Sequence, residues 1–122
     1  MLLERGARVP HFSVRATDGT PVVYIDIWQR RNLLLITLPD SPEFREALTA
    51  YTSALAGRAR DLALYETSVI VTHDAIEGLP SPGVLVADRW GEIYFVYTPR
   101  RTADMPAVDD LVDGLKVIAY KC

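Results

Sequence analysis

The segment Ser41-Pro42-Glu43-Phe44 lies between an apolar run and a helical pattern, so it is a candidate site at the start of a helix. A serine there can act as the N-cap, its hydroxyl oxygen accepting a hydrogen bond from a free N–H of the first turn. As a nucleophile it would need a general base within reach, and neither a Gly-x-Ser-x-Gly context nor another motif supplies one. We therefore interpret Ser41 as the N-cap and Pro42 as the first helical residue, where its missing N–H costs nothing.

A thiol is present only once, at Cys122, the last residue. An internal disulfide is therefore impossible, and so is a structural zinc site built from several sulfur ligands. Cys122 follows a predicted helix, whose dipole disfavours a thiolate at that end. We interpret it as an unreactive terminal thiol, with an intermolecular disulfide as the alternative.

We predict no catalytic or metal-binding role for the other polar and aromatic candidates. His73, Asp74 and Glu77 follow a predicted strand, but a metal ion would need more ligands arranged around it, so a solvated loop is favoured. We interpret His11 as a surface or packing residue early in a strand, and Trp28 and Trp90 as packing residues or aromatics at a turn edge. A tryptophan that proved exposed would instead mark a contact surface. Glycine-rich phosphate loops, EF-hands and HExxH patterns are absent, so the sequence predicts no metal and no cofactor.

Length and composition favour an ordinary globular chain. The 122 residues predict a single domain, residues 1–122, and the 49% hydrophobic and 24% charged contents are typical of one. The net charge of −3, with mixed signs, argues against nucleic acid as the main partner. No run approaches the ~20 apolar residues of a membrane span, and the first ten residues do not resemble a signal peptide. We therefore expect a cytoplasmic protein with no membrane partner.

Six extended segments are predicted. Residues 11–27 contain two runs around Asp18-Gly19, which is a signal for a two-residue hairpin turn. Residues 32–38 form a continuous apolar run, as expected for a strand buried on both faces. Residues 66–72 are β-branched and predict another buried strand. A hairpin follows, with strands at 84–87 and 92–97 and a turn at Asp88–Gly91.

Two helices are predicted. After Ser41, apolar residues recur on one helical stripe, which places Phe44 in the core. Gly57 is either an interior weakness or an early stop, and residues 58–63 are a candidate extension of this helix. A closing helix is expected from about Asp104 to Tyr120, because apolar residues recur at helical spacing and acidic residues lie near its start.

This order of elements resembles the thioredoxin fold in its redoxin form, which is an α/β three-layer sandwich with an added N-terminal β-hairpin. GARVPHFSVRATDGTPVVYID is similar to the redoxin opening, and PGVLVADRWGEIY is similar to the segment that carries the family's cis proline. The resemblance implies that Pro82 is that cis proline, with Ser81 before it. It also implies that residues 41–44 stand where the family has Cys-x-x-Cys.

The sequence departs from the family at the residues that would carry out the catalytic chemistry. Catalysis needs a thiolate at the helix start and a second sulfur three residues later. Ser41 and Phe44 occupy these two positions, so thiol exchange and the peroxiredoxin mechanism are both unavailable there. Whether the ancestor was thioredoxin-like or peroxiredoxin-like stays open, because the deciding positions hold no cysteine.

Three functions follow as hypotheses. The main one is a non-redox binding module that takes a protein or peptide partner in a groove between Ser41 and the Ser81–Pro82 turn. The second is a thiol oxidoreductase or peroxide-reductase relative that uses Cys122, a partner's thiol or an unseen cofactor. The third is a structural subunit that forms a homo-oligomer through apolar edges.

Overall fold

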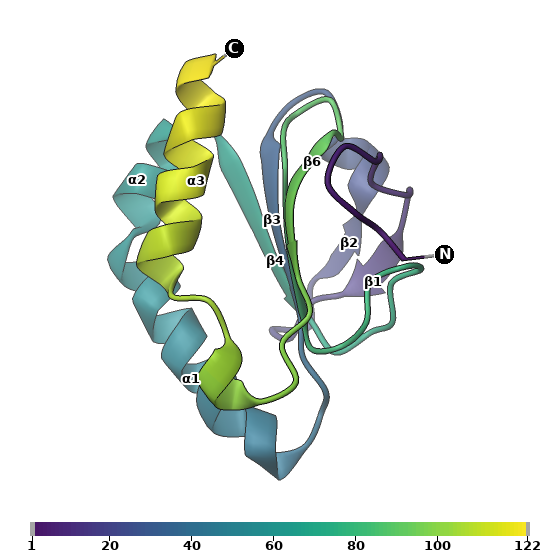
Figure 1. The fold of residues 1–122 in the computed structure, drawn as a ribbon, viewed down its shortest axis with the longest axis vertical. Helices are drawn as coiled ribbons and strands as arrows, with labels where there is room; N and C mark the ends of the chain where they lie inside the picture. The colour runs from purple at the N-terminus through teal and green to yellow at the C-terminus, as the bar shows by residue number, and fades with distance from the viewer. Residues whose placement is uncertain (1, 122) are drawn as a thin grey trace.

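A four-stranded mixed sheet forms the centre of the molecule, as the computed structural model of residues 2–121 shows (Figure 1). The strand order is β4-β3-β5-β6. β3 and β4 are parallel, and the other two pairings are antiparallel. The strands have these bounds: β3 Asn32–Thr37, β4 Thr67–Thr72, β5 Gly83–Ala87 and β6 Ile93–Tyr97.

Two further layers cover the sheet. The helices lie on one face, and the N-terminal hairpin with a short 3-10 helix lies on the other (Figure 1). The three helices have these bounds: α1 Pro42–Gly57, α2 Ala59–Leu64 and α3 Val108–Lys121. The opposite layer holds β1 Ser13–Arg15, β2 Pro21–Val23 and η1 Tyr24–Asp26. The predicted α/β three-layer sandwich with an N-terminal hairpin is confirmed. Within residues 2–121, no helix has the length and the apolar character needed to cross a membrane.

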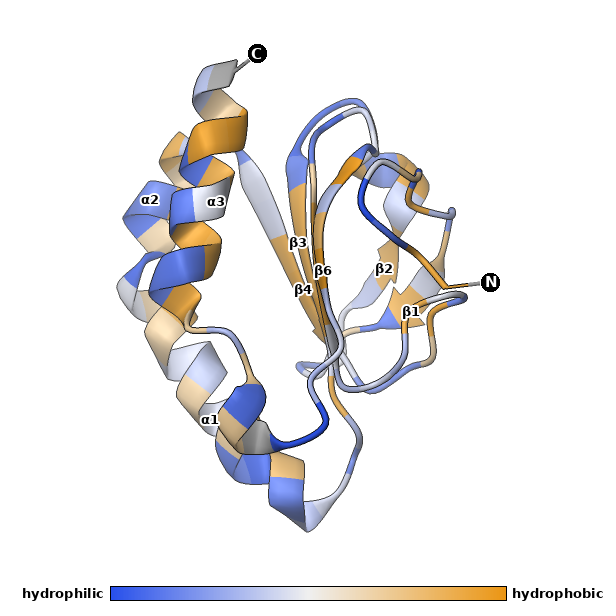
Figure 2. Cartoon of the chain, viewed as in Figure 1, coloured by the Kyte–Doolittle hydropathy of each residue, from blue (hydrophilic) through white to orange (hydrophobic). Residues whose placement is uncertain are grey.

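The core is split by β3 into two clusters. Leu34 and Ile36 belong to the cluster under the helices, whereas Leu33 and Leu35 belong to the cluster under the N-terminal hairpin. All four side chains are fully buried, and Figure 2 shows the strands of the sheet among the most hydrophobic parts of the chain. Because successive side chains of a strand point to opposite faces, burial on both faces explains the continuous apolar run.

The N-terminal hairpin differs from its prediction. Arg15 pairs with Pro21, so residues 16–20 form a five-residue connection rather than a two-residue turn. Within it Gly19 has a φ of 93°, and the carboxylate of Asp18 accepts a bond from the Thr20 N–H at 2.9 Å. The second strand also ends at Val23, because the chain then turns into η1.

The structure decides where both predicted helices begin and end. The first ends at Gly57, which confirms the early-stop alternative; Arg58, whose φ of −112° and ψ of 16° are not helical, separates it from α2, so residues 58–63 do not extend α1. The last helix begins at Val108 and not near Asp104, which belongs to the 3-10 turn η2 (Thr102–Asp104). Pro106 explains the delay, because a proline disfavours helical geometry in the residue before it.

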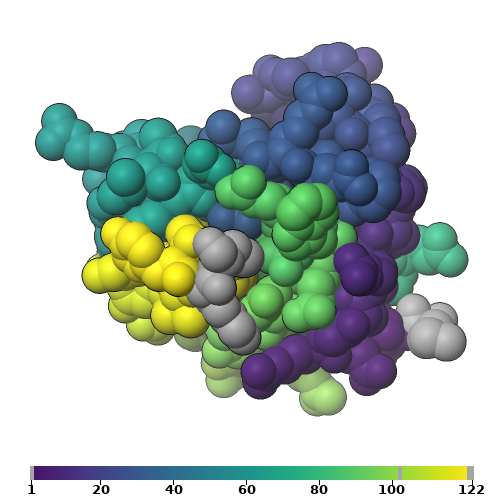
Figure 3. All heavy atoms as spheres, turned by 90° about the horizontal axis from the view of Figure 1, so that it is seen from above, coloured from purple at the N-terminus to yellow at the C-terminus, as the bar shows by residue number. Residues whose placement is uncertain are grey.

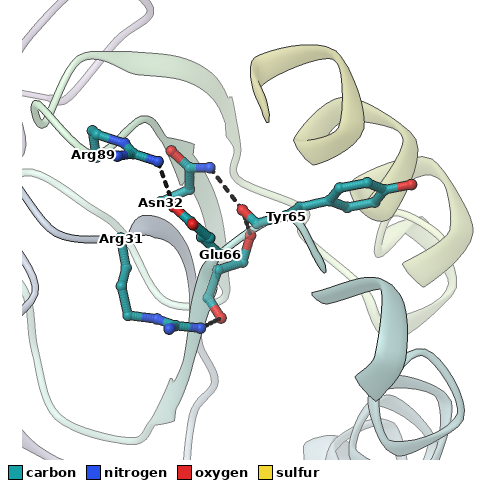
Figure 4. Close-up of polar contacts among 6 residues, drawn as sticks. Arg31, Asn32, Tyr65, Glu66 and Arg89 are labelled. Carbon is teal, nitrogen blue, oxygen red and sulfur yellow. Dashed lines mark hydrogen bonds and ion pairs between the residues drawn. The ribbon is translucent and has the colours of Figure 1, made fainter. Parts of the chain in front are cut away.

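A polar network holds the beginnings of β3 and β4 together (Figure 4). The Asn32 side-chain amide donates to the Tyr65 carbonyl at 2.9 Å, and its backbone N–H donates to the Glu66 carbonyl at 2.9 Å. Arg89 pairs with the Glu66 carboxylate at 2.6 Å, and Arg31 donates to a backbone carbonyl of β4 at 3.0 Å. Buried Asn32 therefore fixes the register at this end of the sheet.

Candidate functional site

The candidate site lies at the carboxyl end of β3, where three segments meet. Thr37 pairs with Gly83, and its hydroxyl lies 3.4 Å from the carbonyl oxygens of both Pro80 and Gly83. Just beyond it, the Leu38 carbonyl is 2.8 Å from Nδ1 of His73. The loop that leads to α1, the turn before β5 and the residue after β4 therefore share one edge of the sheet.

Ser41 occupies the N-cap position but does not use its side chain as a cap. Its φ of −137° and ψ of 157° are extended, and Pro42 begins the helix as predicted. The Ser41 hydroxyl makes no capping bond. The backbone closes the first turn instead, because the Phe44 and Arg45 N–H groups donate to the Ser41 carbonyl at 3.1 and 3.2 Å. The predicted side-chain cap is therefore wrong, although the position is right.

Phe44 is a core residue, as its place on the helical stripe predicted. It is 6% exposed and belongs to the cluster between the helices and the sheet. Glu43, on the opposite side of the first turn, is exposed. Phe44, the third residue after Ser41, thus fills the core with its aromatic ring and offers no group to a ligand.

The turn before β5 has an exposed serine and a cis proline. The Ser81–Pro82 peptide bond is cis, which confirms that prediction. In residues 2–121, the N–H and carbonyl of Ser81 have no hydrogen-bond partner. The next residue is a glycine, Gly83, and a larger side chain would not fit there, because a Cβ would lie 2.3 Å from the Pro80 carbonyl oxygen and 2.9 Å from Leu79 Cδ1. The turn is therefore tightly packed beneath and has free backbone groups outside.

His73 and Asp74 attach their loop to the rest of the fold. Because the Leu38 carbonyl can only accept, Nδ1 of His73 carries the proton in their hydrogen bond. Asp74 accepts the backbone N–H of Arg15 in β1 at 2.7 Å, and Glu77 is exposed. No three His, Cys, Asp or Glu side chains within residues 2–121 are grouped to hold a metal ion. Within residues 2–121 the Ser41 hydroxyl makes no hydrogen bond to His73, so this histidine is not bonded to it as a base.

A recess of about 470 Å³ lies beside the first turns of α1 and was not predicted. It is bounded by Glu43 and Glu46 of α1 and by Met105 and Pro106, which precede α3. Neither Ser41 nor Pro82 lines it. Tyr51 also lines it and donates its hydroxyl to the Pro106 carbonyl. Burial raises the pKa of Tyr51 to about 12, so this donor keeps its proton at neutral pH.

The aromatic candidates and the cysteine have different outcomes. His11 packs its ring against Trp28, with centroids 5.2 Å apart, although the histidine is itself exposed. Trp90 is 50% exposed at the β5–β6 turn, which agrees with the interpretation as an aromatic at a turn edge and not with that as a packing residue. Cys122 lies outside the described residues, and its interpretation stays a prediction.

Comparisons with known proteins identify a fold. No protein-family model matches the sequence, and no curated protein matches it either. The structure of reduced 2-Cys peroxiredoxin from Plasmodium vivax is similar, with a TM-score of 0.74 and 13% identity over 95% of this chain and 82% of that one. A yeast mitochondrial 1-Cys peroxiredoxin gives a TM-score of 0.72 and 11% identity over 98% of this chain and 78% of that one. A peroxiredoxin-like protein from Aquifex aeolicus gives a TM-score of 0.63 and 16% identity over 97% of this chain and 89% of that one.

The similarity covers nearly the whole chain, so the predicted resemblance to the thioredoxin-like fold of peroxiredoxins is confirmed. At these identities it concerns the fold alone. The single cysteine of the sequence, residue 122, does not lie at the start of α1.

Proposed function

We propose that this protein is a non-redox binding module that uses the carboxyl edge of its sheet to hold an extended peptide segment of a protein partner. The observation that carries the proposal is the composition of the first turn of α1. Ser41 and Phe44 stand there, at the positions where the resemblance implies that a redox member of the fold has its two sulfurs. The proposal places the protein in the cytoplasm, where an isolated cysteine stays reduced.

Two features of the edge support peptide binding. The Ser81 N–H and carbonyl are without partners in the described residues, and Ser81 is exposed. An extended peptide can pair with free backbone groups of this kind, which gives affinity without chemistry. The packing beneath Gly83 keeps these groups in place before a partner arrives, which lowers the entropy cost of binding.

The non-redox part is tested with insulin disulfide reduction and peroxide turnover. We expect background rates for the parent protein and for Cys122→Ser. Activity in the parent that disappears in Cys122→Ser would mean that the thiol oxidoreductase hypothesis is correct. Activity that survives in both would reveal non-thiol chemistry and would equally overturn the proposal.

The binding part is tested by selecting peptides from a displayed random library on the parent protein. Ser81→Trp places a large side chain over the free backbone groups, and Ser53→Trp makes the same change at an exposed position late in α1. We expect the selected peptides to bind the parent and Ser53→Trp, and to lose at least about tenfold in affinity for Ser81→Trp. Equal binding to both variants, or no enrichment, would refute this site.

The placement of the lost motif has its own test. The double substitution Ser41→Cys with Phe44→Cys puts two thiols at the positions that the resemblance identifies. We expect some insulin reduction from the folded double variant, because Ser41 stands at the helix start, where a thiolate is favoured. A folded double variant with no dithiol exchange would count against this placement.

A homo-oligomeric structural subunit is the second candidate function. It is favoured by large apolar side chains that are exposed on β6 and α3, namely Tyr97, Val117 and Tyr120. Sedimentation velocity at two protein concentrations tests it. A single monomeric species at both concentrations would remove this candidate.

A further inference from the structure

A second recess, of about 480 Å³, lies at the opposite end of β5 from the Ser81–Pro82 turn. The N-terminal segment, the residues after η1 and the β5–β6 turn meet here, and Figure 3 shows this end of the molecule with these segments in purple, blue and green. The lining residues include Arg8, Pro10, His11, Trp28, Trp90 and Gly91. The volume lies in the usual range for small-molecule sites, about 300–1,000 Å³.

The walls are aromatic and are fixed by hydrogen bonds. The Trp90 carbonyl accepts both the indole N–H of Trp28 at 3.1 Å and Nη1 of Arg8 at 2.6 Å. His11 packs edge-on against Trp28 with an interplanar angle of 82°. These bonds fix the backbone of Trp90, whose half-exposed side chain also lines the recess. Such a pair of indoles suits a flat apolar guest, which can stack or make edge-to-face contacts.

A buried hydroxyl without a partner lies next to the floor. Tyr24 is 1% exposed, and its hydroxyl is the one buried side-chain oxygen or nitrogen in residues 2–121 that lacks a hydrogen-bond partner. It lies beside Gly91, where a Cβ would be only 3.2 Å from it. Burial, followed by the charge of Asp88, raises the pKa of Tyr24 to about 12, so the hydroxyl keeps its proton. A polar guest atom that reached it would relieve the cost of leaving it unpaired.

Arg8 is the group at the recess that could receive an anion. Arg8 is exposed, and its contact with the Trp90 carbonyl uses one of the five N–H donors of a guanidinium. The nearby carboxylate of Asp88 is buried and already accepts the N–H groups of Trp90 and Glu92 at 2.9 and 3.0 Å. The free side of the Arg8 fork therefore remains for a planar anion such as a carboxylate.

We propose that this recess is a binding site for small aromatic carboxylates, with the guest's ring against Trp28 and Trp90 and its carboxylate on Arg8. The site is separate from the peptide-binding edge, because the two lie at opposite ends of β5. It requires no cysteine and no cofactor.

The test is a titration of the ¹⁵N-labelled protein with phenylacetate and with its neutral analogue phenylacetamide. The sequence contains two tryptophans, both at the recess, so two indole N–H signals report on it directly. We expect phenylacetate to shift both signals saturably and to bind at least about tenfold more tightly than the amide, because a charge-assisted hydrogen bond is worth that much. This comparison uses the unmodified protein, so it does not depend on the folding of a variant.

Arg8→Gln should abolish the preference for phenylacetate over phenylacetamide. Arg60→Gln, the matched change at an exposed residue of α2, should keep that preference. Saturable binding of acid and amide with equal affinity would refute the role of Arg8. Absence of a saturable shift of either indole signal would refute the site.

Discussion

Two buried tyrosines give the most discriminating test of the packing described here. Tyr24 and Tyr51 belong to the core clusters on opposite faces of the sheet, and both are nearly inaccessible. Tyr51 donates its hydroxyl to the Pro106 carbonyl, whereas the Tyr24 hydroxyl has no partner in residues 2–121. The same substitution, tyrosine to phenylalanine, should therefore change the free energy of unfolding in opposite directions.

The magnitudes follow from the hydroxyl groups alone, because phenylalanine keeps the ring. Tyr51→Phe removes one hydrogen bond and leaves the Pro106 carbonyl unpaired, so it should lower the free energy of unfolding by about 1–2 kcal/mol. Tyr24→Phe removes a buried group whose desolvation is not offset, so it should raise the free energy of unfolding by about 1 kcal/mol or more. Because the two sites share no partner, the double variant should show the sum of the two changes within about 0.5 kcal/mol.

Equilibrium urea unfolding followed by far-ultraviolet circular dichroism measures these changes, and equal slopes for all four proteins would show that the comparison is valid. A loss of stability in Tyr24→Phe would mean that its hydroxyl has a partner in solution. That result would refute the reasoning about the unpaired group, and with it the floor of the aromatic recess.

Three further predictions concern the same structure. Stability should be full below about pH 10 and should fall towards pH 12, because burial raises the pKa of Tyr24 and Tyr51 from 10.0 to about 12 and the unfolded chain therefore loses these protons first. Each tyrosine can contribute up to about 3 kcal/mol to this loss of stability. Urea midpoints that stay unchanged across this pH window would contradict the prediction. Gly83→Ala should lower the free energy of unfolding by about 1–3 kcal/mol in urea, because a Cβ would meet a backbone carbonyl at 2.3 Å. Gly114→Ala is the matched change in α3, where an added Cβ would meet no atom of residues 2–121 within 4 Å beyond its chain neighbours and the helix backbone, so it should raise the free energy of unfolding by about 0.4–1 kcal/mol. A similar loss of stability in both variants would show that steric contact is not the cause. Ser41→Ala should change it by less than about 0.5 kcal/mol, because the serine makes no capping bond, and a loss near 1 kcal/mol would show that it caps the helix in solution.

The sequence predicted the elements whose pattern is local. Residues 32–38 are continuously apolar because both faces of β3 are buried, and Phe44 lies on a stripe whose period is that of a helix. The Asp18-Gly19 signal was correct about a turn but wrong about its length, since pairing begins only at Arg15 and Pro21. The acidic and apolar residues near Asp104 continued a helical pattern that Pro106 interrupts.

The parts of the sites that could not be predicted depend on contacts between distant segments. The recess beside α1 lies between that helix and the segment of Pro106, which accepts a hydrogen bond from Tyr51, and no local pattern links these two residues. The sequence left open whether Trp90 packs or stands at a turn edge, and the answer depends on the turn in which Asp88 accepts two backbone N–H groups and Trp90 is half exposed. Side-chain capping by Ser41 failed for a local reason, because the backbone already satisfies the first turn.

The arrangement of the sheet has a consequence for how the two proposed sites relate. β5 has the turn proposed to bind a peptide at its start and leads to the aromatic recess at its end, and its five residues place the two roughly 17 Å apart. Both faces of this strand are buried, and it is paired on both edges, with β3 and with β6. Coupling between two sites requires an element with two arrangements, and a fully paired, fully buried strand is a poor candidate for one. Occupation of the recess should therefore leave peptide affinity unchanged, and the two activities can be lost independently by substitutions at opposite ends of one strand.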